Sequence, residues 1–155
     1  MTADRFVISI DPIEELTERE FHLTVAVYPE LDAMRRAARR YHPEAGEHLD
    51  DAGACFQIAK AVAGGSNRLG IMRLSGDLLN PWVIMHEAVH AGVALAFAEC
   101  NRTRGGRLPA QPITLDPYLA GGWAHREELI AYGAHAFAFG IMAELGLIDH
   151  PTEEG

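Results

Sequence analysis

The chain has 155 residues, which suits one domain with a single hydrophobic core, so we expect one domain over residues 1–155. Apolar residues make up 48% and charged residues 23% of the chain, which argues against a disordered or fibrous protein. The formal net charge is −9, and this acidic balance argues against nucleic acid as a partner, because nucleic-acid binding depends on neutralising phosphates.

Cysteine content and apolar stretches bear on where the protein resides. Cys55 and Cys100 are too few for a disulfide framework, and we expect two reduced thiols, with a single bridge as the alternative. The N-terminus lacks the basic-then-apolar pattern of a signal peptide. The longest uncharged apolar stretch, residues 130–143, is too short to span a bilayer. We therefore expect a cytoplasmic protein with no membrane partner.

Two strands and a helix are predicted at the start of the chain. Residues 6–10 and 23–28 are rich in apolar and β-branched residues and are followed by prolines, which predicts two strands paired as a hairpin. Residues 30–41 have the period of an amphipathic helix. Its apolar stripe comprises Leu31, Met34, Ala37 and Ala38. We expect the arginines of the other side to form a solvated face, with a local docking patch as the alternative; they are Arg35, Arg36, Arg39 and Arg40.

A second pair of strands is predicted in the middle of the chain, after a polar loop at residues 42–53. Residues 55–62 are compatible with a strand or a helix, and we favour the strand. A glycine-rich turn at residues 64–67 leads into a strand at 69–74, with Leu69 and Ile71 expected on one face, which Arg73 could share. These two strands would form an antiparallel pair.

Two long helices are predicted in the C-terminal half. Asn80 is a good N-cap and Pro81 suits the first helical position of a helix that continues over residues 82–99. This helix is apolar nearly all round, which predicts that it is buried in the core. A proline-containing linker, with a possible extended piece at 113–115, leads to a helix at 123–145 that stops at Gly146. We expect the tryptophans that begin the two helices, Trp82 and Trp123, to anchor the core.

The first of these helices contains the motif His86-Glu87-Ala88-Val89-His90. Histidines four apart lie on one helix face, so both imidazoles can bind a single ion, and zinc accepts nitrogen and carboxylate ligands. Glu87 can then act as the general base that activates a metal-bound water. The alternative is that these three residues are surface residues on the polar stripe of the helix.

A third zinc ligand is needed, and the second long helix offers one. A metzincin would require glycine and histidine where this chain has Val93 and Ala96, so that class is excluded. Asp116 is a weaker ligand candidate, because the following proline indicates a turn. The last helix opens with HREELIAY over residues 125–132. An HExxH helix followed by a helix bearing ExxA resembles the gluzincin metallopeptidases, especially their minimal single-domain forms, and small metallopeptidase-like proteins of phage and bacterial origin.

The resemblance covers roughly residues 68–142 and rests on five or six positions. It implies an α+β, zincin-like fold, in which a small antiparallel sheet packs on the HExxH helix and on a second helix that carries the third ligand. Matching ExxA places Glu128 at the ligand and Ala131 at a small position that lets the helices approach closely. Tyr132 stands where many gluzincins have Asp or Asn. Glu127 and His125 are the alternatives for the ligand, and neighbouring helix residues point about 100° apart, so only one of the two glutamates should face the metal.

Further catalytic and substrate-binding roles are expected around this site. Tyr132 and His135 share a helix face with Glu128 and could stabilise an oxyanion, the alternative being that Tyr132 packs against the core. The strand at 69–74 would be the edge strand, to which an extended peptide could add. The expected function is zinc-dependent hydrolysis of peptide bonds in a peptide or protein substrate. The alternatives are a non-catalytic metal-binding protein with a structural or host-interaction role, and hydrolysis of a non-peptide amide.

Overall fold

The computed structural model describes residues 3–13, 17–43, 52–103 and 122–149, and the side chains of 101–103 and 122–125 are left out of this description. The described residues form an α+β fold with a four-stranded sheet and three α-helices. In chain order the elements are β1 (Asp4–Ile10), β2 (Phe21–Tyr28), α1 (Leu31–Tyr41), β3 (Ala54–Ile58), the 3-10 helix η2 (Lys60–Gly64), β4 (Arg68–Ser75), the 3-10 helix η3 (Gly76–Leu78), α3 (Pro81–Thr103) and α4 (Gly122–Glu144).

The sheet has the strand order β1-β2-β4-β3 and is mixed. The pairs β1–β2 and β3–β4 are antiparallel, as predicted. Strands β2 and β4 are parallel, so the expectation of an antiparallel sheet is wrong at this junction. The reason is the long connection between them, because α1 and β3 supply the crossover that parallel strands need.

A β-bulge in β4 decides which of its side chains face the main core. His22 is aligned with Arg68, but Thr24 is aligned with Ile71. An advance of two residues along β2 therefore corresponds to an advance of three residues along β4. Gly70 lies in this irregularity with φ 149°, and a Cβ there would stand 2.2 Å from the carbonyl oxygen of Gln57. Leu69 therefore lies in the main core while Ile71 packs on the opposite face, contrary to the expectation that they share one face.

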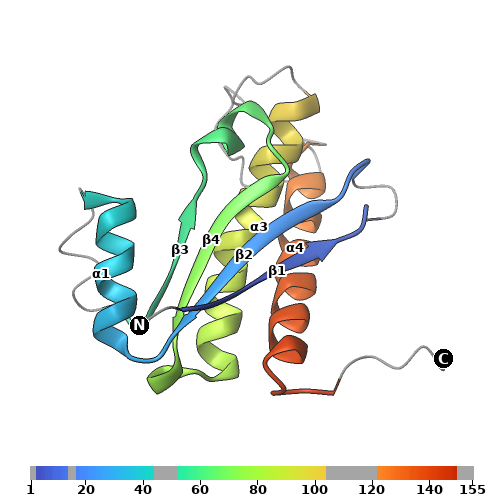
Figure 1. Ribbon diagram of the computed structural model, residues 1–155. Helices are drawn as coiled ribbons and strands as arrows, with labels where there is room; N and C mark the ends of the chain where they lie inside the picture. The colour runs from blue at the N-terminus through green and yellow to red at the C-terminus, as the bar shows by residue number, and fades with distance from the viewer. Residues whose placement is uncertain (1–2, 14–16, 44–51, 104–121, 150–155) are drawn as a thin grey trace.

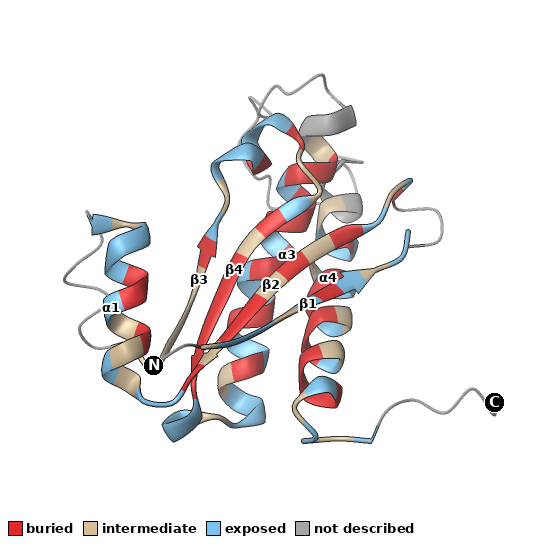
Figure 2. Ribbon diagram, in the orientation of Figure 1, coloured by how far each residue is buried: buried red, intermediate tan, exposed pale blue. Residues whose placement is uncertain are grey.

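Helices cover both faces of the sheet. Helices α3 and α4 lie side by side behind the sheet in Figure 1 and bury the larger core. Its largest fully buried side chains include Phe21, Leu23, Met72, Leu74, Ile84, Leu95, Leu129 and Phe137. Helix α1 packs on the other face through Met34 and Ala37, as its apolar stripe predicted. Figure 2 shows this two-sided burial on the central strands.

The ends of the long helices follow the predicted signals. The Oδ1 atom of Asn80 accepts a hydrogen bond from the backbone N–H of Val83 at 3.1 Å, which confirms the N-cap of α3. Gly146 has φ 73°, and its N–H and that of Leu147 donate to carbonyls of the last turn of α4. This Schellman-type ending confirms the predicted stop.

Helices α3 and α4 run antiparallel (Figure 1), and they approach each other closely at two glycines. A Cβ at Gly133 would stand 3.1 Å from the Cα of Gly92, and a Cβ at Gly92 would stand 2.5 Å from the carbonyl oxygen of Ile130. Ala131, which the sequence predicted at this contact, is exposed. The close approach therefore depends on a glycine pair and not on the alanine of ExxA.

Helix α3 lies in the core as predicted, but only with one face, and its other side is open. Trp82 is 86% exposed and does not anchor the core. Other large apolar side chains of α3 are 36–46% exposed, namely Met85, Val89, Val93 and Phe97. Residues Pro81–Cys100 are long and apolar enough to cross a membrane, and 56% of that stretch is buried inside the fold, as in a core helix.

Candidate metal centre

The two histidines of the HExxH motif lie one helical turn apart on α3, and both are exposed. Their ring centroids are 5.3 Å apart, with an angle of 68° between the ring planes. Around one tetrahedral zinc ion with zinc–nitrogen distances of about 2.0 Å, two imidazole ring centres would lie roughly 5 Å apart. The spacing of His86 and His90 thus fits two ligands of one divalent ion.

Glu87 lies between these histidines in the sequence but is buried, with 7% of its surface exposed. Its carboxylate accepts a hydrogen bond from the backbone N–H of Phe56 in β3. Burial raises the pKa of Glu87 above its usual value, and the electrostatic interaction with His90 and His86 and the Phe56 hydrogen bond offset part of this rise. A buried carboxyl group whose pKa is raised is suited to accept and release a proton.

Cys55 is a neighbour of this carboxylate that the sequence did not connect with the motif. Burial, and after it the negative charge of Glu87, raise the pKa of its thiol, the charge of Arg73 partly offsets both, and the result is a pKa of about 11. Neither Cys55 nor Cys100 forms a disulfide, as expected. Cys55 is therefore a protonated thiol at neutral pH and not a nucleophile of the site.

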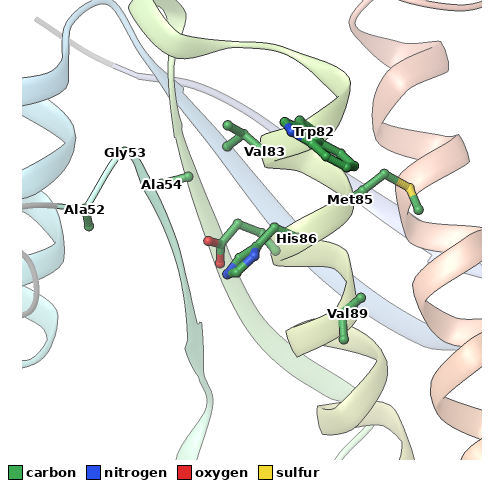
Figure 3. Close-up of a pocket in the computed structure, with 9 residues that line it drawn as sticks. Ala52, Gly53, Ala54, Trp82, Val83, Met85, His86 and Val89 are labelled. Carbon is green, nitrogen blue, oxygen red and sulfur yellow. The ribbon is translucent and has the colours of Figure 1, made fainter.

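A cavity of ≈ 650 Å³ opens beside the motif, between the start of β3 and the N-terminal half of α3. Figure 3 shows His86 on the side of α3 that faces β3, while Met85 points away from β3. The wall on the β3 side consists of small residues: Ala52, Gly53 and Ala54. A second hollow of ≈ 270 Å³ follows along the same junction and is lined by His90 together with Phe56 and Ile58 of β3. Both histidines thus face a groove between the helix and the edge of the sheet.

The strand beside the motif is β3 and not β4, which corrects the expected edge strand. Strand β4 is paired on both sides, whereas β3 is an edge strand of the sheet that the described residues form, and we call its outer side the free edge. The N–H of Phe56 points away from β4, since it bonds to Glu87. Because backbone direction alternates along a strand, the N–H groups of Ala54 and Ile58 point to the same free edge.

The α4 residues that the sequence nominated do not form a ligand group with the histidine pair among the described residues. Glu127, Glu128, Tyr132 and His135 are all exposed. With a rise of 1.5 Å per residue from the contact of Gly92 with Gly133, Glu128 lies about 10 Å along the helix axis from the level of His90. His135 lies at about the level of His90 by the same count.

A complete three-ligand set is not gathered among the described residues: no group of three or more His, Cys, Asp or Glu side chains there could hold a metal ion. Asp116, the extended piece at 113–115 and the side chains of Trp123 and His125 lie outside the described residues. No protein-family model, no curated protein and no solved structure matches this chain.

Proposed function

We propose that the protein is a zinc-dependent metallopeptidase of the zincin type, with the groove between α3 and β3 as its substrate site. The observation that carries the proposal is a pair of exposed imidazoles, with their ring centroids 5.3 Å apart, next to a buried carboxylate whose pKa is raised. These are the two donors and the proton acceptor that hydrolysis at an HExxH site requires.

His86 and His90 would hold the ion, and the gluzincin resemblance assigns the third ligand to Glu128. A divalent ion held there would act as a Lewis acid on the carbonyl group of the substrate. Glu128 is displaced from the level of His90 by about two helical turns, and both histidines point away from Gly92, the residue at which α3 meets α4, by roughly 120–160° around α3, so Glu128 would complete this site only after a rearrangement of α4. The third ligand therefore needs a test that is independent of the histidine pair.

The protein side chains supply the proton transfers. Glu87 takes a proton from the attacking water while the water oxygen bonds to the carbonyl carbon. It then gives this proton to the amide nitrogen as the carbon–nitrogen bond breaks, so that a carboxylic acid and an amine leave. Tyr132 and His135 are the proposed donors to the carbonyl oxygen, where negative charge develops.

The free edge of β3 suits an extended substrate. Backbone groups of Ala54 and Ile58 point to this edge, and a peptide added there as a further strand would pass the two histidines. The small side chains at the start of β3 leave room for the substrate at this point. The proposal thus favours cleavage of extended, unfolded segments over folded ones.

The decisive experiment combines metal content with cleavage. The pure protein is stripped with a chelator and reloaded with zinc, and its action on unfolded casein and on a peptide library is followed by mass spectrometry. We expect zinc to bind in a 1:1 ratio and to restore chelator-sensitive cleavage. Replacing both motif histidines by alanine should abolish zinc binding, whereas His42→Ala, which removes a histidine at the end of α1, should not.

Two results would separate the alternatives. Zinc binding through His86 and His90 without any chelator-sensitive cleavage would support the non-catalytic metal-binding role. Failure of the histidine double variant to alter zinc binding would overturn the metal centre itself.

A further inference from the structure

A groove of ≈ 710 Å³ lies on the face of the sheet opposite α3 and α4, where α1 leaves the sheet uncovered. It is lined by strands β1, β2 and β4 and by Tyr41 at the end of α1. The polar side chains that matter for its chemistry are Arg5, His22, Thr24, Ser66, Arg68 and Arg73. The groove is separate from the proposed metal centre, because the sheet lies between them.

Strand register arranges the cationic side chains in two rows. His22 of β2 is aligned with Arg68 of β4. Two residues further along β2 comes an uncharged row, in which Thr24 is aligned with Val7 of β1. The second charged row follows, since Ala26 is aligned with Arg5 on one side and with Arg73 on the other. A ligand in the groove would thus meet positive charge at both ends of an uncharged middle.

This positive charge is not neutralised within the described part of the chain. No carboxylate lines the groove there, and none of the described carboxylates forms an ion pair with Arg5, Arg68 or Arg73. Among the described residues that line the groove, only His22 forms an ion pair, with 3.4 Å between its Nδ1 atom and an oxygen of Glu20.

Arg73 shows the imbalance most clearly, because it is only 5% exposed. Its Nε donates to the side-chain oxygen of Gln57 at 2.7 Å and a terminal nitrogen donates to the hydroxyl of Tyr28, both of them neutral acceptors. Its guanidinium carbon lies 5.5 Å from the centroid of the Tyr41 ring. A buried guanidinium without a carboxylate raises the affinity of its surroundings for an anion.

We propose that this groove binds a small molecule that carries a phosphate group. Guanidinium groups bind phosphate through paired hydrogen bonds, and the hydroxyls of Thr24 and Ser66 add neutral donors at the same surface. The cavity volume is within the range of small-molecule sites. A polyanionic nucleic acid is disfavoured as the occupant because the chain as a whole carries a net charge of −9.

Calorimetric titration with inorganic pyrophosphate at constant ionic strength tests the proposal. We compare the parent with a groove variant carrying Arg5→Gln and Arg68→Gln, and with a charge-matched control carrying Arg36→Gln and Arg40→Gln. The control arginines are exposed on α1 and do not line the groove. We expect the parent to bind pyrophosphate saturably and the groove variant to bind it at least about tenfold more weakly, because each lost charge-assisted hydrogen bond is worth roughly that much. The control variant should bind pyrophosphate as tightly as the parent.

The location and the size of the ligand are tested in parallel. Amide shifts in the NMR spectrum should change at Thr24 and Gly70 and should persist after zinc is removed. Equal weakening in both arginine variants, or no saturation below about 10 mM pyrophosphate, would overturn the proposal. If the affinity for oligonucleotides rises with each added nucleotide and depends on Arg5 and Arg68, the groove binds a polymer and the small-molecule proposal is wrong.

Discussion

The carboxylate of Glu87 on α3 and the backbone N–H of Phe56 on β3 are joined by a hydrogen bond. This contact holds the proposed general base against the free edge of the sheet, where an extended peptide can pair. Proton transfer and substrate binding would therefore take place on the two sides of one groove.

Glu87→Gln should separate catalysis from metal binding. The amide oxygen of glutamine can still accept the hydrogen bond from Phe56, so the fold and the zinc affinity should be retained, whereas loss of the general base should lower kcat about 10²–10⁴-fold. Zinc content and peptide cleavage of the two proteins provide the measurement. Cleavage at the parental rate would remove Glu87 from the mechanism.

The same variant should be more stable than the parent at neutral pH. Burial raises the pKa of Glu87 in the folded state above its reference value of 4.5. The contribution of the protonated carboxyl group to the free energy of unfolding is therefore fully present below that pH, and it is lost as the pH rises through the folded-state pKa. The thermal midpoint of Glu87→Gln, measured without zinc, should exceed that of the parent at about pH 7, and the difference should shrink at about pH 4. A lower midpoint at neutral pH would show that the ionised carboxylate stabilises the fold.

Cys55 should react slowly with iodoacetamide. Its pKa, raised from 9.0 to about 11, lowers the thiolate fraction at neutral pH about 100-fold relative to an unfolded chain. A Cys100→Ser protein isolates the reaction of Cys55, and the midpoint of its rate against pH reports the pKa directly. Adding Glu87→Gln should move this midpoint down, because the charge of Glu87 is one cause of the rise. An unchanged midpoint would mean that burial alone sets it.

The third ligand can be identified from zinc affinity. Because Glu127 and Glu128 are both exposed, replacing either by glutamine should leave the fold intact. We expect Glu128→Gln to weaken zinc binding at least about tenfold and Glu127→Gln, the matched control, to leave it unchanged. If His135→Ala weakens binding and Glu128→Gln does not, the contact of Gly92 with Gly133 persists in the zinc-bound protein and the ligand lies at the level of His90.

Gly92→Ala should destabilise the packing of α3 on α4. The added Cβ would stand 2.5 Å from the carbonyl oxygen of Ile130 and 2.9 Å from the backbone nitrogen of Ala134, and neither backbone atom can move aside freely. We expect a loss of about 1–3 kcal/mol in urea unfolding, as for other overpacked cores. Gly64→Ala is the control, because a Cβ there meets nothing within 4 Å. Equal stability of the two variants would contradict the tight helix contact.

Local patterns in the sequence predicted most of the elements. The strands, the amphipathic helix α1, the N-cap at Asn80 and the stop at Gly146 were each predicted from side-chain period or backbone preference, and each is present. Residues 55–62 divide into the strand β3 and the start of η2, because this stretch has no clear period. His86 and His90 are four residues apart, and helix geometry alone places such residues on one side of a helix. The motif was therefore enough to predict that they lie together.

The sequence by itself therefore determined the α+β class, the main elements and the histidine pair, because these depend on interactions between residues close in the chain. Only the tertiary structure decided that β2 and β4 are parallel, that β3 forms the edge beside the motif, and that Gly92 meets Gly133. These features depend on contacts between residues far apart in the chain. No local period encodes which strand lies next to which, or how far one helix is displaced along another.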